Sequence, residues 1–508
     1  MRRLVVILGV PVDILTTDEA LDRVDEMVAA GRATGRVHQV ATVNADFVVN
    51  ALHDPELRRI LQRADMTTAD GMPIVWGGRL LGAPLPDRVT GVDLIPPLAG
   101  RAAERGYSLF LLGARPGVAA RAAEKLVARN PGLRIAGVLS PPQSPLVEMD
   151  PGLVAEINAA CPDILLVAFG NPKQEKWIAM HAPALRVPVC IGVGGTLDFI
   201  AGETRRAPRW MRQRGLEWLF RLAQEPRRLW RRYAHDLASF GTHFAGLWLA
   251  ESRAHANGDA AAELISLAGI SLLSVAGVLG RGCCERLLEQ GRAALAETPF
   301  LAIDLSGVTA LDACGAGDLV SLAGAARAAG GDCWLVAPSR AVRTGLARLR
   351  LDSFFRCYPD SAPLATPRPP VPPAVALEPF ADGWVVVRLP RALDAMAAEV
   401  VARHCGERLA EHPRLVVDLS QTIFLSSDGI AALADLARQI RAAGGELRLA
   451  GCSSEVTWSL QQLDLEPALP LFDSLEEAVG GLREEAVGAS RRVPIRPSPR
   501  RAISLARD

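Results

Sequence analysis

An internal repeat restricts the fold of this chain more than any other feature of its sequence. Residues 273–351 align without a gap with residues 387–465, at an offset of 114 positions. Identical residues at this offset are Asp304 and Asp418, Leu305 and Leu419, Ser306 and Ser420, Leu311 and Leu425, Gly315 and Gly429, and Leu351 and Leu465. Such a duplication predicts two globular units of about 100 residues each, rather than a solenoid, whose repeats are shorter and more numerous.

The rest of the 508 residues divides around this repeat. We predict an amino-terminal domain (1–202), a basic helical appendage (203–255), a first copy (262–357) and a second copy (375–484). Seven prolines from Pro359 to Pro373 favour an extended linker, assigned to 358–374. Residues 485–508 are basic and lack apolar periodicity, so a disordered tail is expected there.

Apolar runs alternate with helical patterns along residues 1–202, as in LVVILGV, RVHQVATVN, SLFLLGA, LRIAGVL, DILLVAFG and VPVCIGVGG. Strands that are apolar almost throughout indicate a parallel sheet with helices on both faces. We therefore predict an α/β, Rossmann-like fold. Ligands of such sheets bind outside the carboxyl ends of the strands.

Composition excludes several classes of protein. Lys and Arg number 56, as do Asp and Glu, so nothing in the overall charge suggests a nucleic-acid binder. The nine cysteines are scattered without a C-x-x-C pair, which favours reduced thiols in the cytoplasm over disulfides or a zinc site. The first apolar run is too short for a signal peptide, and residues 264–279 fall short of the roughly 20 that a membrane-spanning helix needs.

Five segments place polar residues or glycines where strands are expected to end. They are TVNADF (42–47), TADGMPIVWGG (68–78), RVTGVDL (88–94), FGNPKQEKW (169–177) and GVGGTLDFIAG (192–202). In order and spacing they resemble the WecG/TagA/CpsF glycosyltransferases (family 26). The resemblance implies inverting transfer of an N-acetylmannosamine-type sugar or another hexose from a UDP-sugar donor to a polyprenyl-diphosphate-linked glycan acceptor, in surface polysaccharide biosynthesis.

The resemblance makes Asp70 the general base, and Thr42 is a second candidate catalytic residue. From the residues alone, Asp70 is an equally good N-cap for a helix beginning at Met72. Thr42 and Asn44 end a strand, where they could hold the sugar or a phosphate oxygen, or could serve only as turn and cap residues.

Other candidate residues would bind the donor. Arg88 could pair with a diphosphate, and Thr90 and Gly91 open a helix whose amino end attracts anions. Gly170, Gln174 and Glu175 resemble the family's nucleotide-sugar signature, although a first-turn glutamate also compensates a helix dipole. Asp198 either faces the cleft or caps a helix. No D-x-D pair or His/Cys cluster with ligand spacing occurs in this half, so we predict neither a metal nor a cofactor.

The appendage is strongly basic. Residues 203–232 contain ten arginines and three glutamates, interleaved with Trp210, Trp218, Phe220 and Trp230. This pattern suits the anionic cytoplasmic membrane surface, which predicts a peripheral association. The alternative is that Trp218, Leu219 and Leu222 pack on the domain while the arginines are solvated. The family resemblance adds a third role, in which Arg214 or Arg221 clamps the diphosphate.

The repeated units resemble STAS domains, as in anti-sigma-factor antagonists. In these domains the loop before the helix carries a serine that is phosphorylated. The first copy has Asp312-Ala313-Cys314-Gly315 there, without a hydroxyl, whereas the second has Ser426-Ser427-Asp428-Gly429. Ser427 is thus a candidate for phosphorylation, with helix capping as the favoured alternative. The resemblance implies regulatory modules that bind a protein partner.

Two other functions compete with a regulated glycosyltransferase. The first is a non-catalytic regulatory protein that senses a sugar nucleotide through a degenerate amino-terminal half. The presence of Thr42, Asn44, Asp70, Arg88 and Gln174 argues against that degeneration. The second is a nicotinamide-dependent oxidoreductase, which needs G-x-G-x-x-G after the first strand, where this chain has LGVPVD.

Overall fold

The computed structural model describes three parts of the chain. They are residues 1–254 except 87, 143, 145, 147–148, 151, 209, 212–216 and 225; residues 261–360 except 268 and 281–283; and residues 376–480 except 381–382, 391, 394–396, 398–399, 402–404, 406–413, 423, 454–455, 458–459 and 461–469. The proline-rich linker (361–375) and the carboxyl-terminal tail (481–508) lie outside the described residues.

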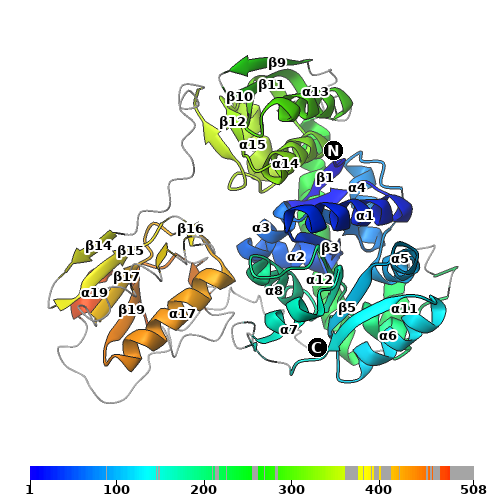
Figure 1. Ribbon diagram of the computed structural model, residues 1–508. Coiled ribbons are helices and arrows are strands. Elements are labelled where there is room, and N and C mark those ends of the chain that lie inside the picture. Colours follow the sequence, from blue (N-terminus) through cyan, green and yellow to red (C-terminus); the bar gives the residue numbers. More distant parts are fainter. Residues whose placement is uncertain are drawn as a thin grey trace, which may run out of the picture.

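The amino-terminal domain is built on a parallel sheet of six strands in the order β4-β3-β8-β7-β5-β6 (Figure 1). The strands are β3 (His38–Val43), β4 (Met66–Ala69), β5 (Ser108–Gly113), β6 (Arg134–Leu139), β7 (Ile164–Ala168) and β8 (Val189–Gly192). All neighbouring pairs are parallel, so the carboxyl ends of all six strands meet at one edge. The predicted α/β, Rossmann-like class is confirmed.

Helices cover both faces of this sheet because successive strand residues point to opposite sides. In β7, Ile164 and Leu166 pack toward the helices α1 (Thr17–Thr34), α5 (Gly91–Arg105), α6 (Val118–Arg129) and α9 (Thr196–Ala201). Leu165 and Val167 instead pack toward α7 (Gly152–Ala160) and α8 (Lys173–His181). The remaining helices of this half are α2 (Ala45–His53), α3 (Pro55–Arg63), α4 (Met72–Leu80), α11 (Glu217–Gln224) and α12 (Pro226–Ala254).

The first apolar run departs from its expected place. Its residues form β1 (Leu4–Ile7), which is buried but pairs antiparallel with β2 (Val10–Asp13) in a hairpin outside the parallel sheet. Leu8 and Gly9 connect the two strands with positive φ values of 50° and 92°. Two residues with positive φ form the turn whose twist suits a tight hairpin. The expectation that this run belongs to the parallel sheet is therefore wrong.

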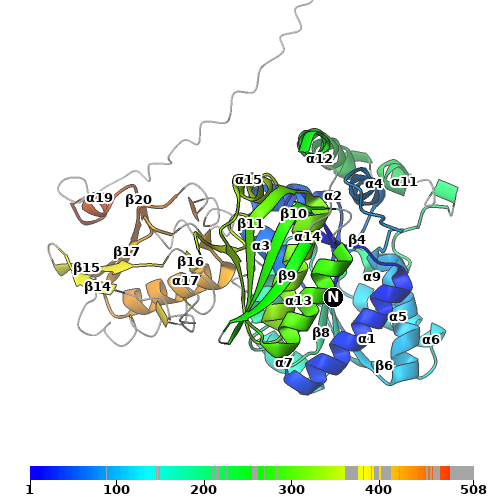
Figure 2. The same cartoon turned by 90° about the horizontal axis from the view of Figure 1, so that it is seen from above.

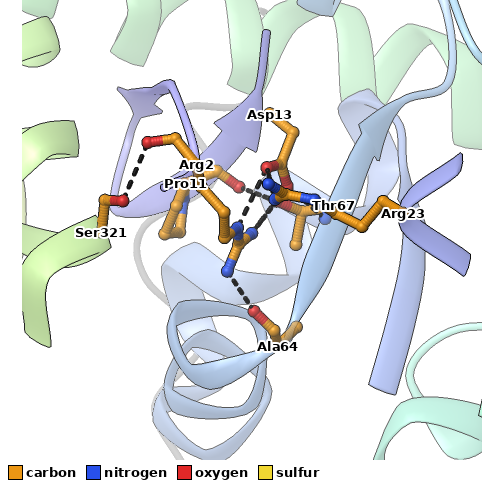
Figure 3. Close-up of polar contacts among 7 residues, drawn as sticks. All are labelled: Arg2, Pro11, Asp13, Arg23, Ala64, Thr67 and Ser321. Atoms are coloured by element: carbon orange, nitrogen blue, oxygen red, sulfur yellow. Dashed lines mark hydrogen bonds and ion pairs between the residues drawn. The ribbon is translucent and has the colours of Figure 1, made fainter. Parts of the chain in front are cut away.

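A buried ionic network fixes the hairpin to the sheet (Figure 3). The carboxylate of Asp13 accepts from Arg2, 2.6 Å away, and from the backbone N–H of Thr67 in β4, 2.7 Å away. Arg23 of α1 lies 3.3 Å from the same carboxylate. On the other side, the hydroxyl of Ser321 donates to the carbonyl of Arg2 at 2.8 Å. Since Ser321 belongs to the first copy, this hairpin joins the first copy to the amino-terminal domain.

Each repeated copy is an α/β unit around a five-stranded sheet. The first copy has the order β13-β12-β11-β10-β9, with β9 (Ala261–Leu267), β10 (Ile270–Leu279), β11 (Leu301–Leu311), β12 (Cys333–Val336) and β13 (Arg356–Tyr358). Its helices are α13 (Cys284–Glu297), α14 (Ala313–Ala328) and α15 (Arg340–Arg348). The apolar window at 264–279 thus forms two paired strands. No helix among the described residues is long and apolar enough to cross a membrane.

The second copy repeats this plan with the order β14-β15-β17-β19-β20. The strands are β14 (Ala376–Pro379), β15 (Val385–Arg388), β17 (Arg414–Asp418), β19 (Glu446–Ala450) and β20 (Leu471–Phe472), with β16 (Ala392–Leu393) and β18 (Phe424–Leu425) forming a small separate pair. Helix α17 (Ser427–Ala442) corresponds to α14, and α19 (Leu475–Gly480) follows β20.

The two copies lie on different parts of the amino-terminal half (Figures 1 and 2). Helix α14 of the first copy packs on β1, and its buried side chains form one apolar cluster with those of β1, β2, α2, α3, α4 and α12. The second copy contacts α3 and α8, and its largest apolar cluster contains only its own residues. The first copy therefore shares a core with the amino-terminal half, whereas the second copy keeps its own.

Candidate functional site

Candidate residues from two strands meet at the carboxyl edge of the sheet. The backbone N–H of Asp70, just after β4, donates to the carbonyl of Val43 at the end of β3 (2.7 Å). Gly71 follows with a φ of 128°, and a Cβ built there would lie 4.0 Å from the Cβ of Asn44. Asp70 and Asn44 therefore lie in adjacent loops, and Thr42 lies two residues before Asn44.

The structure also shows the local contacts of Thr42 and Asn44. The hydroxyl of buried Thr42 donates to the carbonyl of Gly192 at the end of β8 (3.2 Å). Asn44 is the N-cap of α2, where its Oδ1 accepts from the backbone N–H of Phe47 (3.2 Å). Helix α4 has Gly71 as its N-cap, so Asp70 lies one residue before the capping position. Asn44 is therefore a capping residue, whereas the N-cap position predicted for Asp70 is occupied by Gly71.

Gln174 connects the loops that follow β7 and β8. Its Oε1 accepts from the backbone N–H of Gly170 at 3.1 Å and from that of Gly194 at 3.0 Å. The positive φ of Gly170 (80°) is a backbone conformation that glycine adopts without strain. Gln174 is itself buried, so it fixes the backbone of two loops at the edge of the sheet.

Glu175 is not the solvated first-turn glutamate that the sequence allowed. Only 1% of it is exposed, and its Oε1 accepts from the side-chain amide of Gln174 (2.7 Å). Its other oxygen, Oε2, is buried without a hydrogen-bond partner. Burial raises the pKa of Glu175 to about 8, and the nearby Asp46 also raises it. The side chain therefore holds its proton at neutral pH and does not compensate a helix dipole.

Two further residues at this edge were missed by the sequence analysis. Asp46 lies in the first turn of α2, and its carboxylate accepts from the side-chain amide of Asn171 in the loop after β7 (3.3 Å). Both residues lie inside segments that the sequence singled out, TVNADF and FGNPKQEKW. The signal was present, but nothing in the sequence showed that the two segments face each other.

Arg88 is held by an ion pair with the appendage. Its Nη1 lies 2.8 Å from Oε2 of Glu217 in α11, and both side chains are largely buried. Arg206, which the sequence analysis did not single out, pairs with Asp93 in the first turn of α5 and lies 4.0 Å from Glu217. Two guanidinium groups therefore lie beside the amino end of α5, where an anion is favoured electrostatically.

The other binding candidates make local contacts. Thr90 is the N-cap of α5, accepting from the backbone N–H of Asp93 at 3.1 Å. Gly91 leaves room for α9, because a Cβ there would lie 2.5 Å from the hydroxyl of Thr196. Asp198 in α9 forms an ion pair with the exposed Arg115 after β5 (2.9 Å). Asp198 thus lies at the same edge as the other candidates, in an ion pair.

The appendage exposes large apolar side chains. Trp218 and Leu219 of α11 are exposed, which does not support the alternative that they pack on the domain. Other exposed apolar side chains on the appendage and the neighbouring α4 are Trp76, Leu80, Trp210, Trp230, Leu237, Trp248 and Leu249. Helices α4, α11 and α12 lie together at one end of the molecule (Figure 2). Arg214 lies outside the described residues, and Arg221 lies in α11 with a side chain that the structure does not describe.

Ser427 is buried at a contact between the second copy and the amino-terminal domain. It is 1% exposed, and its hydroxyl donates to Oε2 of Glu56 in α3 (2.8 Å). The N-cap of α17 is Ser426, whose hydroxyl accepts from the backbone N–H of Gly429 (3.1 Å). The capping role that the sequence favoured for Ser427 therefore belongs to Ser426. Asp312, the equivalent of Ser426, caps α14 in the first copy.

No group of three or more His, Cys, Asp or Glu side chains among the described residues is arranged to hold a metal ion. Metal independence stays a prediction.

Fold and site together define a class of protein. Polar side chains line the carboxyl edge of the sheet, which is where ligands bind in open α/β folds. A family model described as "Glycosyl transferase WecG/TagA/CpsF family" matches residues 5–254, which include every strand of this sheet. The domain is a glycosyltransferase.

The chain belongs to the WecG/TagA/CpsF family. A relative from Bacillus spizizenii is 31% identical over 225 residues, which cover 42% of this chain and 86% of the relative. A relative from Bacillus subtilis is 34% identical over 194 residues, covering 38% of this chain and 73% of the relative. Both relatives are named N-acetylglucosaminyldiphosphoundecaprenol N-acetyl-beta-D-mannosaminyltransferase.

The carboxyl-terminal copies are STAS domains, whose family model matches residues 263–363 and 378–478. Among solved structures, the Bacillus cell fate determinant SpoIIAA in its phosphorylated form is similar over 22% of this chain and 100% of that chain, with 23% identity and a TM-score of 0.19.

Proposed function

We propose that this protein transfers an N-acetylmannosamine-type sugar, or another hexose, from a UDP-sugar to a polyprenyl-diphosphate-linked acceptor during surface polysaccharide synthesis. The observation that carries the proposal is the meeting of Thr42, Asn44, Asp70 and Gln174 at one edge of the sheet. The two relatives support it, since their names specify an undecaprenol-diphosphate-linked acceptor and a mannosaminyl group.

Asp70 is the base in this proposal. It lies directly after β4, one residue before the N-cap of α4, at the carboxyl edge of the sheet where ligands of such folds bind. The carboxylate takes the proton of the acceptor hydroxyl as that oxygen attacks the anomeric carbon. The bond to the UDP oxygen breaks on the opposite face, so the reaction inverts the anomeric centre. A positioned base typically contributes about 10²- to 10⁴-fold to such a step.

Arginines stabilise the departing diphosphate, without a metal. Arg88 and Arg206 lie beside the amino end of α5. Glu217 pairs with Arg88 and lies within 4.0 Å of Arg206, so an arriving diphosphate competes with this carboxylate for the guanidinium groups. Arg214 and Arg221 of the appendage are the further candidates for the clamp.

The acceptor arrives at a membrane surface. Exposed tryptophans and leucines gather on α4, α11 and α12, the last two within or next to the basic segment. Aromatic and cationic side chains together favour the interface of an anionic membrane. We place the protein at the cytoplasmic face of the membrane, where the diphosphate head of the acceptor faces the site and its chain stays in lipid.

The test is release of UDP from a panel of UDP-sugars with a polyprenyl-diphosphate-linked N-acetylglucosamine acceptor. Asp70→Asn should lower kcat by about 10²- to 10⁴-fold and change the KM for the donor little. Asp22→Asn is the matched control, because Asp22 is an exposed carboxylate on α1 that pairs with Arg101. Equal turnover by Asp70→Asn and the wild type would remove Asp70 as the base.

Metal independence has its own check in the same assay. The wild-type rate should be the same with and without a chelator. Activity that a chelator abolishes and magnesium or manganese restores would contradict this part of the proposal.

A further inference from the structure

The second STAS domain meets the transferase through a small buried polar cluster. Glu56 of α3 accepts two hydrogen bonds from Ser427, one from its backbone N–H and one from its hydroxyl. Lys176 of α8 lies 2.8 Å from the same Glu56 oxygen that receives the hydroxyl, and 2.8 Å from Asp54. Burial lowers the pKa of Lys176, but Glu56 and Asp54 more than offset this and raise it, so the ammonium group stays charged. The carboxylate of Glu56 in α3 thus binds residues of two other helices, α8 and α17.

The first STAS domain makes the equivalent contact with a different glutamate. The backbone N–H of Ala313, 114 positions before Ser427, donates to Oε2 of Glu251 in α12 (3.1 Å). Both copies therefore present the first residue of the same helix to a buried glutamate of the transferase half. The difference lies in the side chain at this position, which is a methyl group in the first copy and a hydroxyl in the second.

The surroundings of the two contacts differ as well. Around Ala313, the apolar side chains of the first copy continue into the core of the transferase half. Around Ser427, the largest apolar cluster of the second copy stays within that copy. Another contact of this interface is polar on one side, with the guanidinium of Arg59 3.8 Å from the ring centre of Phe424. An interface without a shared apolar core buries less apolar surface and therefore separates more easily.

We propose that the second STAS domain is a releasable clamp on α8, held by the neutral Ser427 on Glu56 and released by negative charge at residue 427. An anionic group there would lie against the buried carboxylate of Glu56, whose counter-ion Lys176 is already shared with Asp54. Like charges at such distances repel strongly when little water screens them. The first domain has no hydroxyl at this position and stays attached. Any modification of Ser427 acts on the released form, because the docked hydroxyl is buried.

Release reaches the catalytic edge through α8. Lys176, which shares Glu56 with Ser427, lies in the same helical turn as Gln174, and Gln174 holds the loops after β7 and β8. Loss of the clamp leaves Glu56 and Lys176 exposed to water on this side and weakens the restraint on α8. The effect of release on the catalytic edge depends on the proposed function, because only that function assigns residues of α8 to the donor site.

Two measurements on the full-length chain test the proposal. Both can be made without measuring enzymatic activity. Small-angle scattering should show a larger radius of gyration for Ser427→Asp than for the wild type. Amide hydrogen exchange within residues 173–181 should become faster by roughly three- to thirty-fold, the usual size of such coupling. Aspartate is favourable in the first turn of a helix, so the variant keeps its own fold.

Two further variants make the test specific. Ser420→Asp places the same charge on an exposed serine of the same domain and should leave both measurements at wild-type values. Glu56→Gln combined with Ser427→Asp removes the like charge and should restore the compact form. The proposal is overturned if Ser427→Asp stays as compact as the wild type, if Ser420→Asp expands equally, or if expansion leaves exchange in α8 unchanged. A chain that passes these tests without transferring sugar would contradict only the proposed function.

Discussion

The two STAS domains share a fold and contact the transferase half through the same helix position, yet they join it at different places and in different ways. In the first, α14 lies so close to the hairpin that a Cβ on Gly317 would be 2.3 Å from the carbonyl oxygen of Leu4. The equivalent residue of the second domain is Ala431, whose side chain includes the Cβ atom that position 317 has no room for. The glycine and the missing hydroxyl fit a permanent attachment of the first domain, whereas Ser427 and the separate apolar cluster fit the release proposed for the second.

The largest expected difference between the two STAS domains is the effect of their removal on the stability of the transferase half. A chain ending at residue 360 loses only the second STAS domain and should unfold within a few degrees of the full-length transferase transition. A chain ending at residue 254 uncovers β1 and its neighbours, several of whose side chains are worth about 1.5–3 kcal/mol each when buried, so we expect a loss of at least about 5 kcal/mol. Differential scanning calorimetry measures both. Equal transition temperatures for the two truncated chains would contradict the claim that only the first STAS domain shares a core with the transferase half.

Loss of the Glu251 carboxylate should be the next largest effect. Glu251→Ala removes the acceptor of the Ala313 N–H and the partner of Arg348, whose Nη2 lies 2.6 Å from Glu251. Removing one member of a buried ion pair costs about 3 kcal/mol. Chemical denaturation of the chain ending at residue 360 checks this value. Glu263→Ala, a change on β9 at an exposed position, is the control and should alter stability by less than about 0.5 kcal/mol; an equally small effect of Glu251→Ala would contradict the anchoring role.

Adding one methyl group should test the close approach of α14 to the hairpin. Gly317→Ala forces the helix away from Leu4, and overpacking of this kind costs about 1–3 kcal/mol. Gly324→Ala lies on the same helix with no atom within 4 Å of the added Cβ, so it should stabilise by up to about 1 kcal/mol. Thermal unfolding of the two variants should shift in opposite directions. Shifts of the same sign would show that β1 and α14 are less tightly packed than described.

The smallest expected effect is a dependence of the first attachment on pH. Burial raises the pKa of Glu251 above its ordinary value of 4.5, with a further contribution from Asp312 that Arg348 opposes. The folded state then keeps this proton at pH values at which the unfolded chain has released it. The contribution of Glu251 to stability is therefore greatest below 4.5 and falls as the pH rises through the raised pKa. Glu251→Gln should flatten this part of the stability profile measured by denaturation; an unchanged profile would contradict the assignment.

The sequence predicted those parts of the molecule that depend on local pattern. Apolar runs such as DILLVAFG indicated the parallel sheet, because only strands covered on both faces are apolar throughout. The same pattern led us to assign LVVILGV to the parallel sheet, which is wrong. A hairpin strand that is buried between two domains is equally apolar, so the two cases look alike in the sequence. What distinguishes the two cases is the pair of positive φ values at Leu8 and Gly9, and leucine gives no sign of that conformation.

The candidate site could be predicted as a set of segments but not as a set of contacts. The ends of the strands indicated Asp70, Asn44 and Gln174, because parallel strands bring these ends to one edge. The buried, protonated state of Glu175 depends on how α8 packs, which the sequence does not encode locally. Contacts between distant segments, such as Glu56 with Ser427, depend on how whole domains pack. No local sequence pattern indicates them.

The central claim is that the amino-terminal half transfers a sugar to a lipid-linked acceptor, and mass spectrometry of the acceptor tests it most directly. After incubation of the full-length chain with UDP-N-acetylmannosamine and polyprenyl-diphosphate-linked N-acetylglucosamine, we predict an acceptor heavier by one N-acetylhexosamine residue. Asp70→Asn should form this product only in trace amounts over the same time. An acceptor of unchanged mass with every UDP-hexose and UDP-N-acetylhexosamine offered would contradict the claim.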